Sequence, residues 1–222
     1  MPYSLSPSKL NLLEDCPRCF WLELIKKQSR PSGGFPTLPS GVDKKIKEHF
    51  DRFRSNNSLP PELKKANVNA ELFKDMELLN IWRNNRKGIQ YNNENGIVLR
   101  GAVDEILQDK DKLIVLDFKT KGYEIKEDSA HVYKDQLDIY NFLLRKNNYK
   151  TEDYGYILFY VPDSIIETGE FIFKTDLIKM NINVDHAEEL FNKAINVLDN
   201  NMPESSEDCR YCKFRNNTSQ SS

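Results

Sequence analysis

The sequence of 222 residues predicts a single α/β domain, in which helices and strands pack in layers. Two observations predict this fold class. Segments with helical periodicity stand at both ends of the chain, whereas strand-like segments gather in its middle. A further helical segment interrupts the strands, so that three strands, a helix, two strands and a helix follow one another. Helices interleaved with strands bury their apolar faces by packing against a sheet.

The first part of the chain, about residues 1–87, is predicted to be helical. Ser6 precedes Pro7 as an N-cap precedes the first residue of a helix, and Pro17 is expected to start a second helix. Residues 29–40 contain three prolines and two glycines, a composition that predicts a loop.

Two further helices are expected before the strands begin. Ser40 is the predicted N-cap of a helix whose apolar residues share one face. Those residues are Val42, Ile46, Phe50 and Phe53. Periodic apolar residues predict the next helix over about 71–86, and Gly88 ends it.

The second part, about residues 88–182, is predicted to form the sheet, and the third, 183–222, a helix and a cysteine-containing tail. Leu113–Leu116 is a continuous apolar run, which indicates a buried central strand. Gln108–Asp111 is expected to join it to the preceding strand as a hairpin. The predicted strands are 89–91, 97–107, 112–120, 154–161 and 170–182, and the predicted helices are 130–145 and 185–198.

Composition indicates a soluble globular protein, because 39% of the residues are hydrophobic and 30% are charged. No apolar run is long enough to span a membrane. The N-terminus lacks the basic and apolar regions of a secretory signal, so a cytoplasmic location is expected. The net charge of -2 does not by itself indicate nucleic-acid binding, although a locally basic groove on such a protein can bind DNA.

The four cysteines form two C-x-x-C pairs, Cys16 with Cys19 and Cys209 with Cys212. In a cytoplasmic protein, such pairs favour metal binding over disulfides. Four thiolates suit either tetrahedral zinc or an iron–sulfur cluster, and their spacing does not decide between the two. Because the pairs lie near opposite ends of the chain, a shared metal would join the two terminal segments.

Two aspartates and a lysine form the candidate catalytic site. Asp104 is expected on one strand of the hairpin, and Asp117 and Lys119 on the next. Side chains two apart on a strand point to the same face, so Asp117 and Lys119 lie together. Charged residues on a buried strand are rare unless they are paired or functional. Two carboxylates and a lysine can hold a divalent cation and position a water beside a phosphate.

These residues resemble the PD-(D/E)XK nuclease superfamily, in its RecB-like branch. CRISPR-associated RecB-like exonucleases and the AddB nuclease domain are similar. The segments that carry the resemblance are Gly101-x-x-Asp104, Asp117-x-Lys119, Gln136-x-x-x-Tyr140, Ser6-x-Ser8-x-Leu10 and Cys16-Pro17-Arg18. Together they extend over nearly the whole chain.

The resemblance implies a restriction-endonuclease-like fold with a mixed central sheet, and metal-dependent hydrolysis of DNA phosphodiester bonds. It implies that Asp104 and Asp117 bind Mg²⁺ or Mn²⁺ and that Lys119 acts in the chemical step. It also places Gln136 and Tyr140 near the nucleic acid. The alternative is that Gln136 is an ordinary surface amide and Tyr140 an aromatic residue at the edge of the core. DNA is the implied partner, and a helicase or DNA-processing complex is a possible protein partner.

Two departures from the pattern of these relatives bear on the metals. Iron–sulfur relatives carry one cysteine at the head and three at the tail, whereas this chain has two and two. Because the total of four cysteines is kept, the resemblance still implies a [4Fe–4S] cluster, while the two-and-two arrangement gives weight to Zn²⁺ as the alternative. The relatives also place a metal-binding histidine before the core, where this chain has Asp43. We favour Asp43 as the additional ligand over the nearby His49, and either can instead be a solvated helix residue.

Two functions remain open from the sequence. The first is a nuclease that cuts single-stranded DNA or DNA ends, and an exonuclease in repair, recombination or CRISPR-type DNA processing is the expected form. The alternative is a nucleic-acid-binding subunit of a larger complex with little or no cutting activity. The presence of Asp104, Asp117 and Lys119 favours the first.

Overall fold

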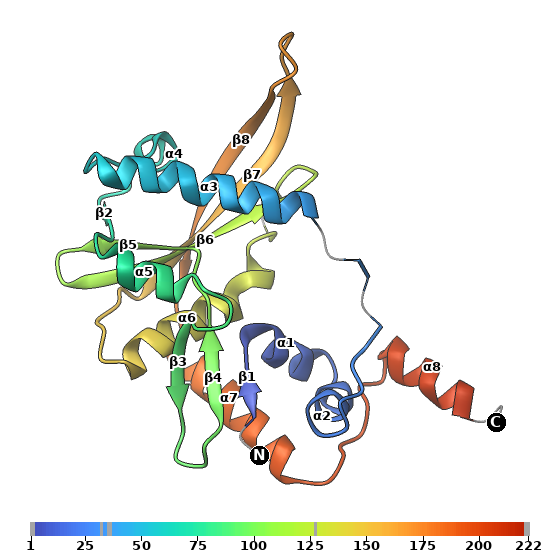
Figure 1. The fold of residues 1–222 in the computed structure, drawn as a ribbon. Coiled ribbons are helices and arrows are strands. Elements are labelled where there is room, and N and C mark those ends of the chain that lie inside the picture. Colours follow the sequence, from blue (N-terminus) through green and yellow to red (C-terminus); the bar gives the residue numbers. More distant parts are fainter. Residues whose placement is uncertain (1–2, 32, 35–36, 127, 220–222) are drawn as a thin grey trace.

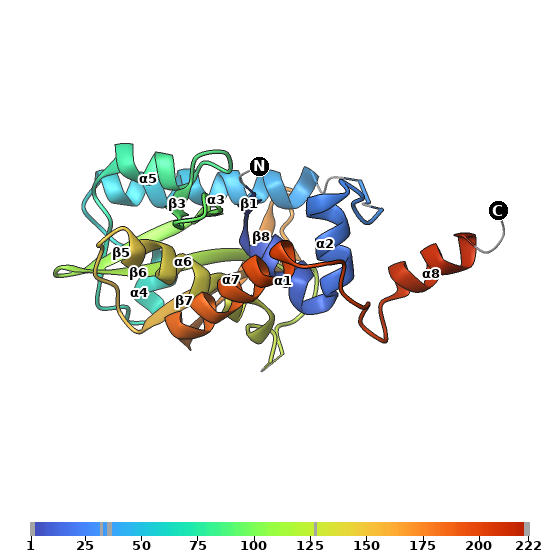
Figure 2. The same cartoon turned by 90° about the horizontal axis from the view of Figure 1, so that it is seen from below.

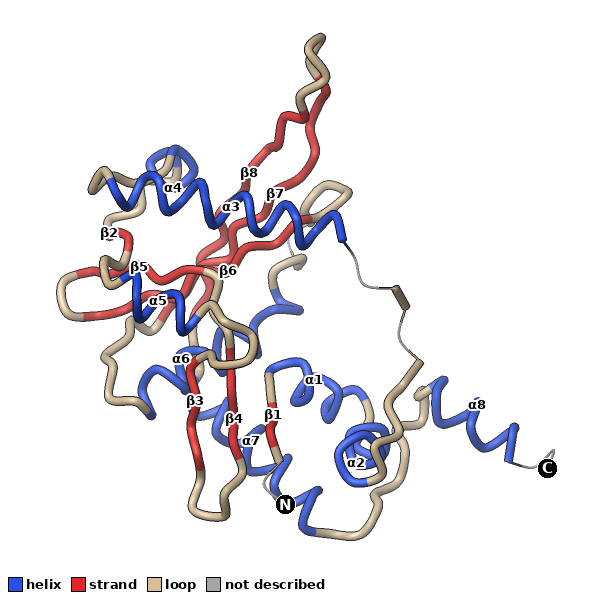
Figure 3. Tube along the Cα trace, in the orientation of Figure 1, coloured by secondary structure: helices blue, strands red, loops and turns tan. Residues whose placement is uncertain are grey.

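The computed structural model describes residues 3–31, 33–34, 37–126 and 128–219, with side chains to residue 215. Figure 1 and Figure 3 show its helices and strands, with runs of helices near both ends of the chain and most strands in its middle. The helices are α1 (Pro7–Asp15), α2 (Pro17–Ile25), α3 (Thr37–Ser55), α4 (Pro61–Lys65), α5 (Met76–Trp82), α6 (Lys134–Lys146), α7 (Val184–Asp199) and α8 (Arg210–Ser219), with a 3-10 turn at His131–Tyr133. None of the helices in this described part is long and apolar enough to cross a membrane.

The strands form two sheets. A five-stranded sheet has the order β2-β5-β6-β7-β8, and it is mixed because β6 and β7 run parallel while the other pairs are antiparallel. A three-stranded sheet has the order β1-β4-β3. The strand bounds are β1 Ser4–Leu5, β2 Glu71–Leu72, β3 Ile89–Asn92, β4 Val98–Gly101, β5 Glu105–Asp109, β6 Lys112–Thr120, β7 Tyr154–Ile165 and β8 Phe171–Asn181.

Strand β6 is central, as its continuous apolar run predicts. Leu113–Leu116 is buried throughout, with β5 on one side and β7 on the other. Helix α3 crosses one face of this sheet, where Phe50 packs on Phe118 with ring centroids 4.8 Å apart. Helix α6 covers the other face and packs against α7 (Figure 2). Residues that alternate along β6 therefore face two different hydrophobic layers.

Two parts of the chain extend from these layers. The β7–β8 hairpin projects beyond the sheet, and helix α8 reaches away from it on the side of α2 (Figure 1). Phe171 and Ile172 near the hairpin tip are exposed. The described N-terminal helices and the C-terminal tail lie side by side, although they come from opposite ends of the sequence.

Helix α3 begins earlier than the sequence indicated. Its first residue is Thr37, so Ser40 lies inside the helix and does not cap it. Pro39 falls in the first turn, where the missing proline N–H has no helical partner to lose, and the helix tolerates it.

The segment predicted as one helix over 71–86 is a short strand followed by α5. Leu72 pairs with Leu107 in the sheet, and backbone pairing prevails there over helical periodicity. Asp75 then caps α5 by accepting a hydrogen bond from the N–H of Leu78 at 2.9 Å. A last helix, α8, occupies the tail, for which the sequence predicted no helix.

The predicted strand 97–107 is two strands in different sheets. The chain leaves β4 at Gly101 and enters β5 at Glu105, with a bend between them. The N–H of Val103 donates to the carbonyl of Trp82 at 3.1 Å, and the guanidinium of Arg83 donates to the carbonyl of Asp104 at 2.9 Å. These contacts fix the bend, so Asp104 lies between two strands and not on one.

Candidate active site

The bend after β4 brings Asp104 to Asp117 on β6. Oδ2 of Asp104 accepts a hydrogen bond from the backbone N–H of Phe118 at 3.0 Å. Because Phe118 follows Asp117, this bond fixes Asp104 against the strand that carries the second acid. The structure thus brings together the two carboxylates of the candidate site, which we call the acid pair.

Asp117 is almost fully buried, with 1% of its surface exposed. Oδ1 accepts a hydrogen bond from the Gln136 amide at 3.0 Å. Oδ2 lies 2.5 Å from Nζ of Lys119, but no group of the described chain makes a hydrogen bond of good geometry to it. Burial raises the pKa of Asp117, the charge of Asp104 raises it further, and Lys119 offsets part of this shift.

An acid pair with these properties suits a divalent cation. A buried carboxylate oxygen without a hydrogen bond is costly, and a second negative charge beside it adds repulsion. Oxygen ligands are those that Mg²⁺ and Mn²⁺ prefer, and a bound cation would remove both penalties. The donor set therefore fits such an ion.

Lys119 lies between the acid pair and the start of α6. Its ammonium group donates to Oε1 of Gln136 at 3.1 Å and lies 4.7 Å from the ring centroid of Tyr133. These contacts hold the side chain on the face of β6 that carries Asp117. Tyr133, just before α6, thus contacts the lysine through its ring.

Gln136 and Tyr140 lie one turn apart on α6, as their spacing predicts. The amide of Gln136 donates to the hydroxyl of Tyr140 at 2.7 Å, so the same amide group contacts Tyr140 and Asp117. Tyr140 is 4% exposed, and burial, followed by the charges of the acid pair, raises its pKa well above the usual value. Gly101 allows this packing, because an added Cβ would lie 2.7 Å from the tyrosine ring.

Comparison with known protein families shows which family this chain belongs to. The model of the PD-(D/E)XK nuclease superfamily matches residues 36–217, most of the chain. The chain belongs to the PD-(D/E)XK nuclease superfamily. Members are metal-dependent nucleases, so the predicted class of enzyme, hydrolase, and the predicted partner, DNA, are confirmed at the level of the superfamily. No curated protein matches the sequence.

Lys47 of this PD-(D/E)XK chain is a site residue that the sequence did not single out. Its ammonium group lies 2.8 Å from Oδ1 of Asp104 and 2.8 Å from Oδ2 of Asp43, one turn earlier on α3. Burial acts to lower the pKa of Lys47, but the two carboxylates raise it above its usual value. The (i, i+4) spacing of Asp43 and Lys47 could have indicated their ion pair from the sequence. The neighbouring lysines made this segment resemble an ordinary solvated helix face.

The structure separates the two candidates for an additional metal ligand. Asp43 reaches the acid pair through Lys47, whereas His49 lies elsewhere on α3. A ring nitrogen of His49 is 3.2 Å from Glu62, which also accepts a hydrogen bond from the Tyr160 hydroxyl at 3.0 Å. The structure does not bring His49 to the acid pair.

A buried charge network fixes the backbone next to the acid pair. Glu105 is fully buried, and its Oε2 lies 2.5 Å from Arg54 and 2.9 Å from Arg83. Arg83 also donates to the Asp104 carbonyl, so the network fixes the backbone that presents the first acid. Burial raises the pKa of Glu105, and both arginines act to lower it. No family motif quoted above includes these residues, and only the fold brings them together.

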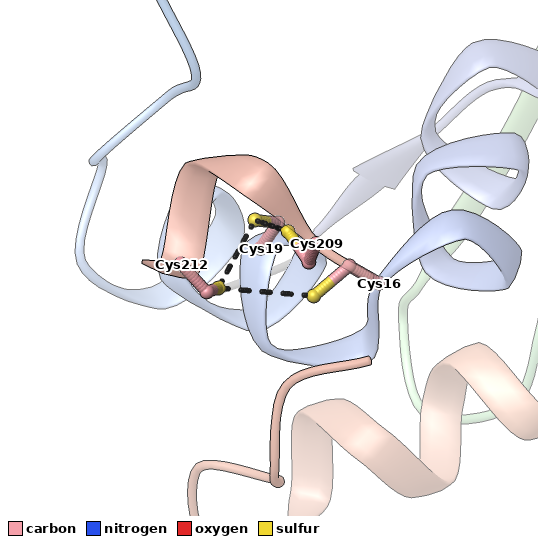
Figure 4. Close-up of side chains that lie close together, drawn as sticks. All are labelled: Cys16, Cys19, Cys209 and Cys212. Carbon is pink, nitrogen blue, oxygen red and sulfur yellow. Dashed lines mark hydrogen bonds between the residues drawn. The ribbon is translucent and has the colours of Figure 1, made fainter. Parts of the chain in front are cut away.

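The four cysteines form a second, separate group, which we call the cysteine site. The C-x-x-C pairs come from the start of α2 and from α8, and all four thiols are buried and lie close together (Figure 4). Burial raises the pKa of Cys19, even though Arg30 lowers it, and burial with neighbouring thiols raises the pKa of Cys212. Soft thiolates in such a group are ligands for zinc or iron.

Proposed function

We propose that this protein hydrolyses phosphodiester bonds of DNA with Mg²⁺ or Mn²⁺ as cofactor. The observation that carries the proposal is the convergence of Asp104, Asp117 and Lys119 around the buried Oδ2 of Asp117, which contacts Lys119 but receives no hydrogen bond of good geometry from the described residues. The two carboxylates would hold the cation, with the Phe118 carbonyl as a further ligand. Asp43 would join them when Lys47 moves, and we do not assign His49 a role here.

Each group at this site has a role that its contacts support. When bound, the cation supplies Lewis-acid polarisation of the phosphate and lowers the pKa of a water. Lys119 would orient that water or stabilise the negative charge that grows at phosphorus. Gln136 holds both Asp117 and Lys119, and buried Tyr140 in turn holds Gln136. We therefore propose that Gln136 faces the DNA strand and that Tyr140 positions it.

A groove beside the site favours single-stranded DNA or frayed ends as substrate. It runs between the first turns of α3 and the projecting β7–β8 hairpin, and it reaches residues 120–122, which follow Lys119. Its apolar walls include Leu38, Val42, Phe171 and Phe173. Aromatic and apolar surfaces bind unstacked bases, which a closed duplex does not offer. Lys121 also lines the groove and supplies positive charge for the phosphates.

The proposal also includes the type of nuclease and the process that the sequence led us to expect. A RecB-like exonuclease acting in DNA repair, recombination or CRISPR-type processing agrees with the motif set. The alternative, a DNA-binding subunit with little cutting activity, differs in one measurable respect, because it requires binding without metal-dependent cleavage.

The test is cleavage of labelled DNA by the purified full-length protein. With Mg²⁺ or Mn²⁺ we expect cleavage of single strands to exceed that of blunt duplex, and a chelator to abolish both. Lys119→Ala should lower the rate at least about 100-fold, the usual cost of removing one group that stabilises transition-state charge. Lys150→Ala, which removes an exposed lysine paired with Asp111, is the matched control and should cut normally.

Two outcomes would count against the proposal. Binding of single-stranded DNA by the parent protein without any cleavage would favour the subunit alternative. Equal rates for Lys119→Ala and the parent would show that the assigned site is not the catalytic one.

A further inference from the structure

The cysteine site raises the question of which metal it holds. Neither the acid pair nor the proposed DNA groove includes any of its residues, so it has no part in the proposed cleavage chemistry. The four thiols come from two segments that are almost 200 residues apart in sequence, and Figure 4 shows their sulfurs pointing toward one another. The distances between these sulfurs distinguish the candidate metals.

The measured separations are those of ligands around one ion. Sγ of Cys19 lies 3.5 Å from that of Cys209 and 3.6 Å from that of Cys212, and Cys16 lies 3.8 Å from Cys212. Tetrahedral zinc binds sulfur at about 2.3 Å, and tetrahedral geometry then places neighbouring sulfurs roughly 3.8 Å apart. The three separations agree with this value to within a few tenths of an ångström.

A [4Fe–4S] cluster does not fit the same four sulfurs. Each cysteine of such a cluster binds a different iron atom, so the thiolates lie at four outer corners, roughly 6 Å from one another. Nothing in the described cysteine site approaches that spacing. The cluster that the resemblance implied is therefore not the group that this arrangement accommodates.

Arg30 supplies the outer contact that such an ion requires. Four thiolates and one divalent cation leave a net charge of −2, which a buried site must offset. The Arg30 guanidinium, which also forms an ion pair with Asp15, lies 3.5 Å from Sγ of Cys209 and offsets part of this charge. It stacks on Tyr211, with its carbon 4.5 Å from the ring centroid. A cation that donates to a ligating sulfur is the expected partner of a thiolate–metal site.

We propose that Cys16, Cys19, Cys209 and Cys212 bind a single tetrahedral Zn²⁺ ion that attaches α8 to α2. Helix α8 packs against α2 and otherwise extends away from the sheets, as Figures 1 and 2 show. Hydrogen bonds from Arg215 of α8 to the carbonyls of Gln28 and Ser29, at 3.1 and 3.2 Å, also join this helix to the segment that follows α2. The ion is thus a structural link between the two ends of the chain. This inference does not depend on the proposed nuclease function.

The first experiment is elemental and sulfide analysis of protein prepared without oxygen from medium containing both iron and zinc. We expect colourless protein with one zinc per chain and no acid-labile sulfide. A mercurial thiol reagent, added stepwise to the folded protein, should release that zinc as about four equivalents react. Brown protein with several iron atoms and sulfide per chain would overturn the proposal, and so would one iron without sulfide or no metal at all.

The second experiment tests the structural link by hydrogen exchange of the full-length zinc-loaded protein. Cys209→Ser should lose the zinc and exchange faster in α8 and at the start of α2, with β6 unchanged. Asp208→Asn alters the adjacent exposed residue and should keep both zinc and protection. If Cys209→Ser does not fold, the mercurial titration of the parent still decides the metal. Unchanged protection of α8 in folded, zinc-free Cys209→Ser would overturn the link.

Lys119→Ala separates the two proposals. It should lose cleavage and keep its zinc, because Lys119 contacts no residue of the cysteine site. Failure of the nuclease proposal therefore leaves the zinc measurement unaffected, and a failed zinc measurement leaves the cleavage assay unaffected.

Discussion

Replacing Lys47 with methionine tests whether this lysine competes with a metal ion for Asp104. The ammonium group of Lys47 lies 2.8 Å from both Asp104 and Asp43, in a position where it offsets their charge. A cation that binds Asp104 must compete with this contact. Methionine has a similar length and no charge, so the substitution removes the competitor with little change of packing.

The contact sets the size of the expected effect. A hydrogen bond to a charged group contributes about 1.5–3 kcal/mol. Lys47 keeps about a fifth of its side chain exposed, which favours the lower end of that range. At roughly 1.4 kcal/mol for each factor of ten, Lys47→Met should bind Mn²⁺ about 10-fold to 100-fold more tightly. Without metal it should be less stable than the parent, since Asp104 loses its counter-charge.

Calorimetric titration with Mn²⁺ in the absence of DNA measures the affinity directly. Lys45→Met is the matched control, because Lys45 is a neighbouring exposed lysine that pairs with Glu48 and should leave the affinity unchanged. Equal or weaker Mn²⁺ binding by Lys47→Met would refute the idea that this lysine competes with the cation.

Three further predictions concern the groups around the acid pair. Glu105→Gln removes the buried carboxylate that Arg54 and Arg83 share and leaves them only Asp51 as a counter-charge, so it should cost about 1.5–3 kcal/mol in urea unfolding. Glu152→Gln, at a partly exposed pair with a lysine, should cost less than about 1 kcal/mol, and equal costs would contradict this account of the network. Gly101→Ala pushes a Cβ into the Tyr140 ring, so we expect about 1–3 kcal/mol of destabilisation together with slower cleavage, and normal activity would refute the role of this packing. Because the pKa of Asp117 is raised, the metal-free folded protein keeps a proton on this group at pH values above the ordinary aspartate range. The affinity for Mn²⁺ should therefore rise from pH 6 to pH 8 with proton release, and the stability of the metal-free protein should fall as the pH rises toward that raised pKa. Calorimetry in two buffers of different ionisation enthalpy measures the proton release, and a pH-independent affinity would contradict the prediction.

The succession of elements from β6 to α7 and the strand that carries Asp117 and Lys119 were predictable from sequence because both depend on local pattern. The run Leu113–Leu116 gives β6 its burial, and the alternation that follows places Asp117 and Lys119 on one face. Helix spacing likewise placed Gln136 and Tyr140 together on α6. In each case, the residues that matter are a few positions apart, and backbone geometry alone relates them.

Tertiary contacts decided the elements that the sequence misassigned. Pairing of Leu72 with Leu107 converts the start of a periodic segment into β2. The bend at 102–104 is held by Trp82 and Arg83, which lie about twenty residues earlier in the sequence. No local sequence pattern therefore predicts it. Glu105 was missed for the same reason, because its partners Arg54 and Arg83 are distant in sequence. The contact of Lys47 with Asp104 is likewise a contact between distant segments, although the pairing of Lys47 with Asp43 is local.

The cysteines show where spacing stops being informative and geometry becomes decisive. Two C-x-x-C pairs are compatible with one ion or with a cluster, since both use four thiolates. What separates them is the distance across the site between sulfurs of different pairs, such as Cys19 and Cys209. That distance depends on how α2 and α8 approach each other, which only the folded chain defines. The two candidate metal sites are also built from different elements: α3, β6 and α6 carry the acid pair and its neighbours, whereas α2 and α8 hold the cysteines. Loss of the proposed zinc ion should therefore loosen α8 before it disturbs the acid pair.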